Sequence, residues 1–261
     1  DSLTTAPANV AIGANALTAL TTGDTVGENT AVGHNSMAAN TTGFRNTAYG
    51  AYALDANTTA DNNTALGWSA LGANTTGVSN VALGYAALDA NTTANNNTAL
   101  GYNALGDNTT GTENVAVGGF AGDAITTGNH NTAIGYQTFG GSSTASYSTA
   151  VGAYALDAAV TGNSNSAFGY FAMSATTSGV NNCAFGVNSM SVHTTSDDNS
   201  AFGAESLFSL TTGAKNTAVG RSALRLLTTG TENVAVGQGA LDVATTGNYN
   251  TGIGTGALSD H

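Results

Sequence analysis

The sequence predicts an all-β protein, a parallel β-solenoid or β-roll of about fifteen coils with 17 residues each. Three observations predict this fold: a 17-residue pattern repeats along nearly the whole chain, a large apolar residue recurs at one position of it, and a glycine always follows that residue. Each repeat in such a chain contacts mainly its neighbours, so the 261 residues need not divide into globular domains. We therefore expect a lead-in over residues 1–8 and a single repeat domain over residues 9–261.

The repeat is clearest in NTALGYNALGDNTTGTE, from Asn97 to Glu113. Positions one to five hold Asn, then Thr, Val or Ser, then Ala, a large apolar residue and Gly, while positions thirteen to fifteen often hold Thr-Thr-Gly. The first copy, Asn9 to Glu28, has 20 residues, and we expect its three extra residues to form a bulging loop. From the second copy onward the spacing is always 17, and the copies begin at Asn9, Asn29, Asn46, Asn63, Asn80, Asn97, Asn114, Asn131, Ser148, Asn165, Asn182, Asn199, Asn216, Asn233 and Asn250.

Positions two to four predict a short strand. A large apolar residue at position four and Thr or Val at position two alternate with period two, which is the pattern of a strand. The large residues are expected to face the core. A helix is excluded because Gly, Thr and Asn make up most of each repeat and no 3.6-residue apolar stripe persists. Leu or Met at position nine predicts a second short strand with its side chains inside.

Glycine at position five, present in all fifteen copies, indicates either a positive φ or a backbone approach too close for a Cβ atom. Both alternatives place a corner there. The Thr-Thr-Gly that follows is typical of a turn and closes the coil. Because stacked coils place equal positions above one another about 4.8 Å apart, the Asn and Thr columns are expected to form hydrogen-bonded ladders.

Alanine at position three predicts an oligomer. If positions two and four face the core, strand alternation turns position three outward. A solvent-facing position would tolerate Lys, Glu or Thr, yet fourteen copies carry Ala and the last carries Gly252. We therefore expect this column at or near a contact between chains, most simply in a homotrimer. The contact residues expected are Ala31, Ala48, Ala65, Ala82, Ala99, Ala116 and Ala133.

Composition excludes several functions. Four Lys and Arg against sixteen Asp and Glu give a net charge of −12, which repels nucleic acid. No apolar run approaches the roughly 20 residues of a membrane span, so no membrane insertion is expected. The histidines occupy unrelated positions of the repeat and Cys183 is alone, so no metal site, cofactor or enzymatic centre is expected. The histidines are His34, His130, His193 and His261.

Aspartate recurs on every second coil at position ten, with glycine on the coils between. Two coils separate successive carboxylates by about 10 Å, close to the screening length at physiological salt, so a solvated column accounts for the pattern. A calcium-binding column is the alternative, although calcium needs six or more oxygen ligands. The column is Asp55, Asp89, Asp123 and Asp157, with Gly72, Gly106 and Gly140 between them.

Aromatic residues gather at position six, with further rings beside them at position seven. Rings on a β surface either pack against neighbouring coils and chains or stack on sugar rings, and packing is the commoner use. Both interpretations stay open, the second implying a carbohydrate-binding surface. The position-six residues are Trp68, Tyr85, Tyr102, Tyr136 and Tyr170.

Three segments of the repeat carry a resemblance to known families. NVAVG at Asn114–Gly118, NTAIG at Asn131–Gly135 and NTAVG at Asn216–Gly220 resemble a motif in the heads of trimeric autotransporter adhesins, and they are similar to repeat arrays of phage tail fibres. The adhesin resemblance implies a left-handed parallel β-roll in which three chains pack side by side. The 17-residue coil is longer than the coils of the adhesin heads.

These observations favour a structural and adhesive function. We expect an extracellular segment of a longer fibre, on a virion or a cell surface, whose partners are further copies of the chain and a surface glycan or receptor. An ice-binding solenoid is the alternative from another class, because paired Thr columns could match a water lattice. It is motivated by Thr41-Thr42, Thr58-Thr59, Thr75-Thr76, Thr92-Thr93 and Thr109-Thr110.

Overall fold

A computed structural model describes residues 8–20, 27–141, 143–158 and 160–259. The chain forms two compact units, Asp1–His130 and Asn131–His261, each of which is a stack of coils. Strands are the regular elements of the described residues, which contain no helix. The predicted parallel β-solenoid with 17-residue coils is thereby confirmed. Most of the lead-in and most of the loop predicted in the first repeat lie outside the described residues.

Each coil contributes one strand of three residues at positions two to four. The first unit holds β1 (Val10–Ile12), β2 (Thr30–Val32), β3 (Thr47–Tyr49), β4 (Thr64–Leu66), β5 (Val81–Leu83), β6 (Thr98–Leu100) and β7 (Val115–Val117). The second unit holds β8 (Thr132–Ile134), β9 (Thr149–Val151), β10 (Ser166–Phe168), β11 (Cys183–Phe185), β12 (Ser200–Phe202), β13 (Thr217–Val219), β14 (Val234–Val236) and β15 (Thr251–Ile253).

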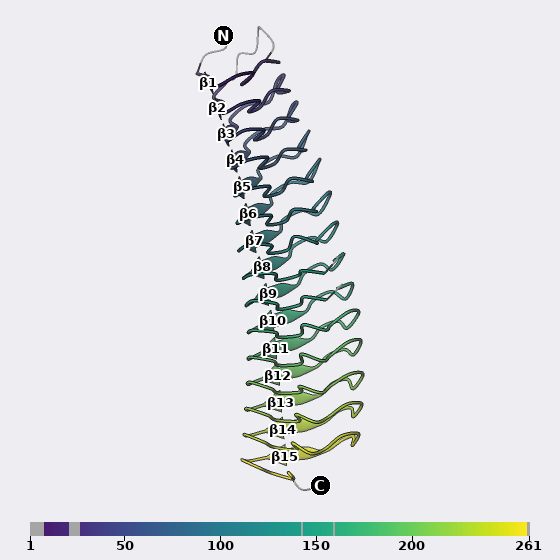
Figure 1. Cartoon of the computed structure of the whole chain (residues 1–261). Coiled ribbons are helices and arrows are strands. Elements are labelled where there is room, and N and C mark those ends of the chain that lie inside the picture. The colour runs from purple at the N-terminus through teal and green to yellow at the C-terminus, as the bar shows by residue number, and fades with distance from the viewer. Residues whose placement is uncertain (1–7, 21–26, 142, 159, 260–261) are drawn as a thin grey trace. The chain divides into compact units, whose positions relative to one another are not determined.

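Within each unit the strands stack in chain order and in parallel (Figure 1). Equal positions of the repeat face one another, so that Ala65 pairs with Ala82 and Leu66 with Leu83. Within the described residues no second strand forms around position nine, because that segment is a tight turn in which Leu88, for example, has a φ of 53°. Left-handed backbone of this kind cannot continue a strand.

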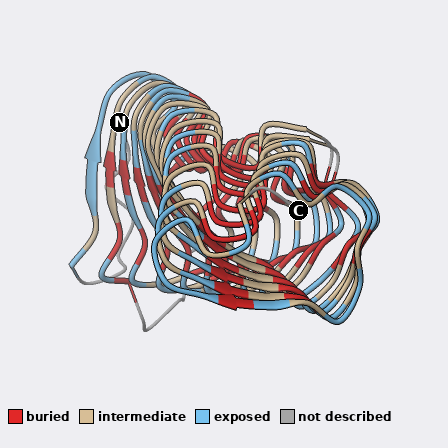
Figure 2. Ribbon diagram, turned by 90° about the horizontal axis from the view of Figure 1, so that it is seen from below, coloured by how far each residue is buried: buried red, intermediate tan, exposed pale blue. Residues whose placement is uncertain are grey.

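The orientation of the strands is the reverse of the expected one. Alanine at position three faces the inside of the coil, with 0% exposure at Ala65 and Ala99, whereas Leu66 and Leu100 at position four face outward. Buried residues line the interior of the coils in Figure 2. The expectation that the Ala column contacts another chain is therefore wrong. The residues that it named, Ala31, Ala48, Ala65, Ala82, Ala99, Ala116 and Ala133, are buried within their own chain.

The narrow interior explains this orientation. Leu or Met at position nine fills the space that faces the strand, as predicted for that row, and Leu54, Leu71 and Leu88 are fully buried there. At Gly252, which holds position three of β15, an added Cβ would lie 3.0 Å from Cγ of Leu241. An alanine methyl group therefore just fits against the position-nine side chain, and a larger residue would not. Packing at this density leaves no room for a Leu on the inner face.

Glycine at position five has both a positive φ and a close backbone neighbour, the two alternatives that the sequence indicated. Gly84 has a φ of 143°, and a Cβ added there would lie 2.2 Å from the carbonyl oxygen of Gly101 on the next coil. Only glycine adopts this conformation without strain and lets two backbones approach so closely. The corner after each strand therefore requires glycine for a conformational reason and for a steric reason.

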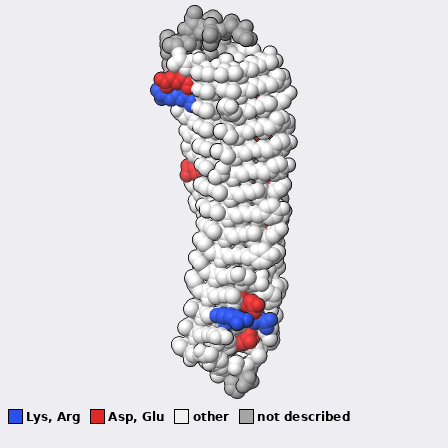
Figure 3. Space-filling model, turned by 60° about the vertical axis from the view of Figure 1, so that its left-hand side comes forward, with Lys and Arg blue, Asp and Glu red and all other residues white. Residues whose placement is uncertain are grey.

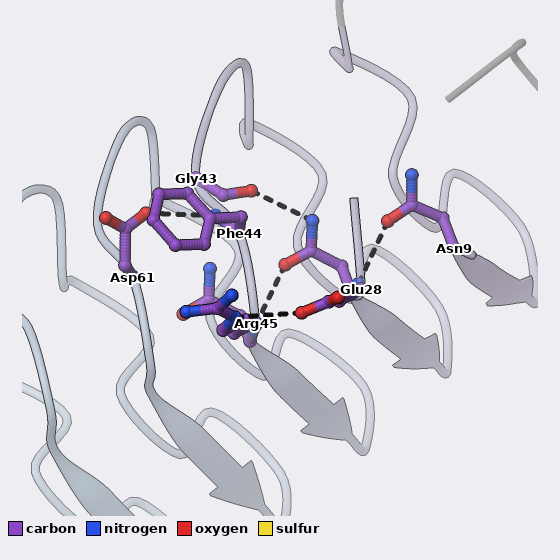
Figure 4. Close-up of polar contacts among 8 residues, drawn as sticks. Asn9, Glu28, Gly43, Phe44, Arg45 and Asp61 are labelled. Carbon is purple, nitrogen blue, oxygen red and sulfur yellow. Dashed lines mark hydrogen bonds and ion pairs between the residues drawn. The ribbon is translucent and has the colours of Figure 1, made fainter. Parts of the chain in front are cut away.

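Asparagine at position one forms the predicted ladder (Figure 4). The backbone N–H of Asn46 donates to Oδ1 of Asn29 at 2.9 Å, and Nδ2 of Asn46 donates to the carbonyl of Ala60 at 2.7 Å. The Asn46 side chain thus takes part in bonds to the next coil and to the far side of its own coil. This amide is fully buried and satisfied, which is the condition under which buried polar groups stabilise a fold.

Candidate interaction surface

The strands present an uncharged outer surface in each unit, with a large apolar residue at position four and mostly Thr, Ser or Val at position two. Positions two and four point outward, and we call these two columns the strand face. Neither column contains an Asp, Glu, Lys, Arg or His residue in any repeat. The large exposed position-four residues are Ile12, Tyr49, Leu66, Leu83 and Leu100 in the first unit and Ile134, Phe185, Phe202, Val219, Val236 and Ile253 in the second.

An exposed apolar face of this kind is unusual for a parallel sheet. Parallel sheets are generally covered on both faces, and here the coil interior covers only one of them. The face turned forward in Figure 3 carries only small clusters of charged side chains. Contiguous apolar surface on a soluble protein commonly marks an interaction site. The strand face is therefore the candidate site of the molecule.

The aromatic residues at position six form ladders rather than separate platforms. Trp68 and Tyr85 stack with ring centroids 4.8 Å apart and an interplanar angle of 12°. Tyr85 and Tyr102 stack at 5.1 Å and 6°. In the second unit, Tyr154 at position seven lies between Tyr136 and Tyr170 with edge contacts to both rings. The structure thus brings the predicted aromatic residues together within each unit.

This stacking bears on the carbohydrate-binding alternative. Tyr85 lies between Trp68 and Tyr102, so both faces of its ring are covered by other rings. A sugar ring packs against the face of an aromatic side chain, whereas the stacked rings of the first unit cover one another's faces. The arrangement therefore favours packing between coils and contact with other apolar groups over sugar stacking.

The aspartate column has a steric explanation. A Cβ added at Gly72 would lie 2.7 Å from Oδ1 of Asp89, so the glycine makes room for the carboxylate of the next coil. The hydroxyl of Ser69 donates to the same oxygen at 2.7 Å. Burial raises the pKa of Asp157. Burial also raises the pKa of Asp55, and the negative charge of Asp89 raises it further. Among the described residues, no three His, Cys, Asp or Glu side chains gather in a group suited to a metal ion.

The other candidate reactive groups lie in unrelated surroundings. His34 packs edge-on against Tyr52, and Nδ1 of His130 lies 2.9 Å from Oε2 of Glu113. His193 is fully buried, while His261 lies outside the described residues. Cys183 is half-buried, and burial raises the pKa of its thiol, which lowers its reactivity.

A second polar column at position sixteen was missed by the sequence analysis. The backbone N–H of Phe44 donates to Oδ1 of Asp61 at 3.0 Å, and that of Val78 donates to Oδ1 of Asn95 at 2.7 Å. From Asp61 to Asp197, Asp or Asn on every second coil thus caps the turn of the preceding coil. The signal was present, because these residues alternate with the same 34-residue period as the aspartate column.

The two threonine columns differ in their bonding. Oγ1 of Thr58 at position thirteen donates to the carbonyl of Thr75 at 3.1 Å, so this column forms the predicted ladder. The next column, at position fourteen, faces solvent. Its exposed members in the first unit are Thr42, Thr59, Thr76, Thr93, Thr110 and Thr127.

Comparison with known proteins gives this chain no family. No known protein family matches the sequence, and no curated protein matches it. Within the described residues, no helix has the length and apolar character needed to cross a membrane. The fold itself defines the class: the chain is a parallel β-solenoid repeat protein.

Proposed function

We propose that the chain is a structural segment of an extracellular adhesive fibre and that it works as a homo-oligomer, a homotrimer in the simplest case. The observation that carries this proposal is the strand face, which in each unit carries an exposed apolar column at position four and no ionic side chain. Covering this face with further copies of the chain would give each sheet the second apolar layer that parallel sheets require.

Charge supports a second copy as the partner. The chain has a net charge of −12, so two copies repel each other over most of their surface. Positions two and four carry no ionic side chain, so copies can approach at the strand face without burying a carboxylate. The buried Ala column takes no part in this contact.

The resemblance to trimeric adhesin heads and phage fibres supports the trimer, the left-handed coil and attachment to a host or another surface. It rests on short motifs such as NTAIG at Asn131–Gly135. In those families such arrays hold binding surfaces away from a virion or a cell. We accordingly place this chain outside the cell, with a surface glycan or receptor as the partner of the complete fibre.

Sedimentation velocity at micromolar concentration tests the assembly. We expect one species with three times the 25.6 kDa mass of a single chain. Phe202→Lys, which places a charge on the strand face of the second unit, should weaken it measurably. Thr212→Lys, on the exposed position-fourteen column of the same coil, is the matched control and should leave it intact. A folded monomer of the unaltered chain would contradict the proposal.

Ice binding is a second candidate, and the exposed position-fourteen threonines favour it. These hydroxyls recur once per coil, at about 4.8 Å, along the stack. The neighbouring position-thirteen hydroxyls are already bonded to the next coil, so only one column of each Thr pair is available to water. Thermal hysteresis in dilute solution tests this function, and Thr76→Lys with Thr93→Lys should abolish any hysteresis that is found.

A further inference from the structure

We infer that copies of the chain are held together mainly by one patch on the fourth to sixth coils of the first unit. The inference rests on the proposed homo-oligomer and states where the strongest contact between its chains lies. We call this surface the coil 4–6 patch. It consists of Leu66, Trp68, Leu83, Tyr85, Leu100 and Tyr102.

The coil 4–6 patch joins two exposed columns. Its leucines hold position four and its rings hold position six, on the two sides of the corner glycine. Two residues along a chain lie at most about 7 Å apart, so the two columns are adjacent. All six residues are between 42% and 52% exposed. A partner can therefore cover roughly half of each side chain.

The size of the patch suits a contact between proteins. An aromatic side chain buries 150–250 Å² when it is covered completely, so half-exposed rings and leucines present roughly 500 Å² together. A stable protein interface needs about 800 Å² from each partner. The patch supplies more than half of this area, and the remaining positions two and four of the strand face can supply the rest.

The chemistry of the patch suits a second copy. The fourth coil, residues 63–79, contains no charged residue, and Asp89, Asp107 and Glu113 on the next two coils lie outside the patch. The stacked rings offer apolar edges, and the hydroxyls of Tyr85 and Tyr102 make no hydrogen bond within the described part of the chain. Tyr and Trp side chains dominate the strongest contacts of protein interfaces. In a cyclic oligomer whose rotation axis passes beside the patch, the same patch of every copy faces that axis.

Trp68 allows a direct test because it is the only tryptophan of the chain. Acrylamide quenching of its fluorescence is measured in the unaltered protein while sedimentation reports the oligomeric state of the same sample. We expect quenching to fall several-fold when the protein is concentrated from the monomer into the oligomer, because the partner covers the indole edge. An oligomer in which Trp68 stays as accessible as in the monomer would overturn the inference and leave the proposed oligomer intact.

A matched pair of variants on the fifth coil completes the test. Leu83→Lys places a charge at the centre of the patch, whereas Thr93→Lys places the same charge at position fourteen of that coil. We expect Leu83→Lys to weaken assembly about thirty-fold or more, as loss of a central interface residue does. Thr93→Lys should have no effect. Equal behaviour of the two variants in an oligomer would overturn the inference, and a monomeric unaltered chain would overturn it together with the proposed function.

Discussion

The two units fill the interior of the coil with different side chains at position twelve. In the first unit this column is asparagine from Asn40 to Asn108, and Nδ2 of Asn57 donates to Oδ1 of Asn40 at 2.9 Å. In the second unit the column contains Thr176 and His193, followed by Leu210 and then by Leu227. All of these side chains are fully buried.

What the units share explains why position twelve can differ. In both, the position-one asparagine donates to the carbonyl at position fifteen: Asn80 to Ala94 at 2.8 Å, and Asn216 to Gly230 at 2.9 Å. That carbonyl therefore has a partner whether position twelve is polar or apolar. A run of amides and a run of leucines are both acceptable at position twelve, whereas a leucine placed inside the run of amides removes the bonds between neighbouring amides.

The largest effect should fall on a feature common to both units, the corner glycine. Gly84→Ala and Gly220→Ala each place a Cβ within 2.6 Å of the next coil's backbone at a φ that alanine avoids. We expect each to cost at least about 3 kcal/mol of unfolding free energy, measured by urea denaturation. Gly239→Ala is the control for the steric contact, because its φ of 64° also disfavours alanine but no atom lies within 4 Å of its added Cβ. Similar stability of all three variants would show that the corner is not under steric constraint.

A smaller effect should separate the two interiors. Asn74→Leu removes the bond from Nδ2 of Asn74 to Asn57 and leaves Nδ2 of Asn91 without its Asn74 acceptor. The expected cost is about 1–3 kcal/mol in urea denaturation. Replacing the whole first-unit column by leucine should cost much less than the sum of the single changes, because no amide is then left unpaired. Additive costs would contradict this comparison.

The pH dependence of stability should differ between the units because of His193. Its Nδ1 lies 2.9 Å from the Thr176 hydroxyl and its Nε2 lies 2.8 Å from the carbonyl of Ser196. Burial lowers the pKa of this imidazole, against the opposing effects of that carbonyl and of the Asp197 charge. The unfolded chain then takes up the proton first, so stability should fall as the pH drops through about 6.5.

His193→Asn installs the residue that the first unit carries at this position. Thermal unfolding of both proteins between pH 7 and pH 5 isolates the effect of the histidine, since every other titrating group is the same. The unaltered chain should lose more stability than the variant. An identical loss in the two would show that burial of His193 does not couple folding to protonation.

The smallest effect should come from the surface ion pairs. Arg45 and Glu28 in the first unit meet at 2.8 Å with both side chains 56% exposed, and Arg225 and Glu205 in the second meet at 3.2 Å. Exposed pairs contribute about 0–1 kcal/mol and are screened by salt. Arg45→Ala should therefore shift the urea midpoint barely and Arg225→Ala slightly more, with both shifts vanishing at high salt.

Most of the fold could be predicted from the sequence, but the orientation of the strands could not. The 17-residue spacing and the repeated Asn and Gly columns indicate the coil, the corner and the amide ladder directly. The period-two pattern of a strand, by contrast, shows that positions two and four share one face and position three the other, but it does not show which face is inside the coil. The large residue at position four was placed inside because of its size, yet the unvarying Ala at position three was the signal of an interior that admits only a methyl group. The spacing predicts that the aromatic residues lie in one column, whereas the angles between their rings depend on the backbone geometry and could not be predicted.

Distances between spin labels test the central claim, that the strand face lies inside a homo-oligomer. Leu100→Cys labels position four and Thr110→Cys labels position fourteen of the same coil. Both variants also carry Cys183→Ser, so that the new cysteine is the only one to take the label. Serine is the natural residue at the same repeat position in the neighbouring coils, at Ser166 and Ser200. Double electron–electron resonance should give a shorter distance between chains for the Leu100 label than for the Thr110 label. A longer distance for Leu100, or no coupling between chains at either site, would contradict the claim.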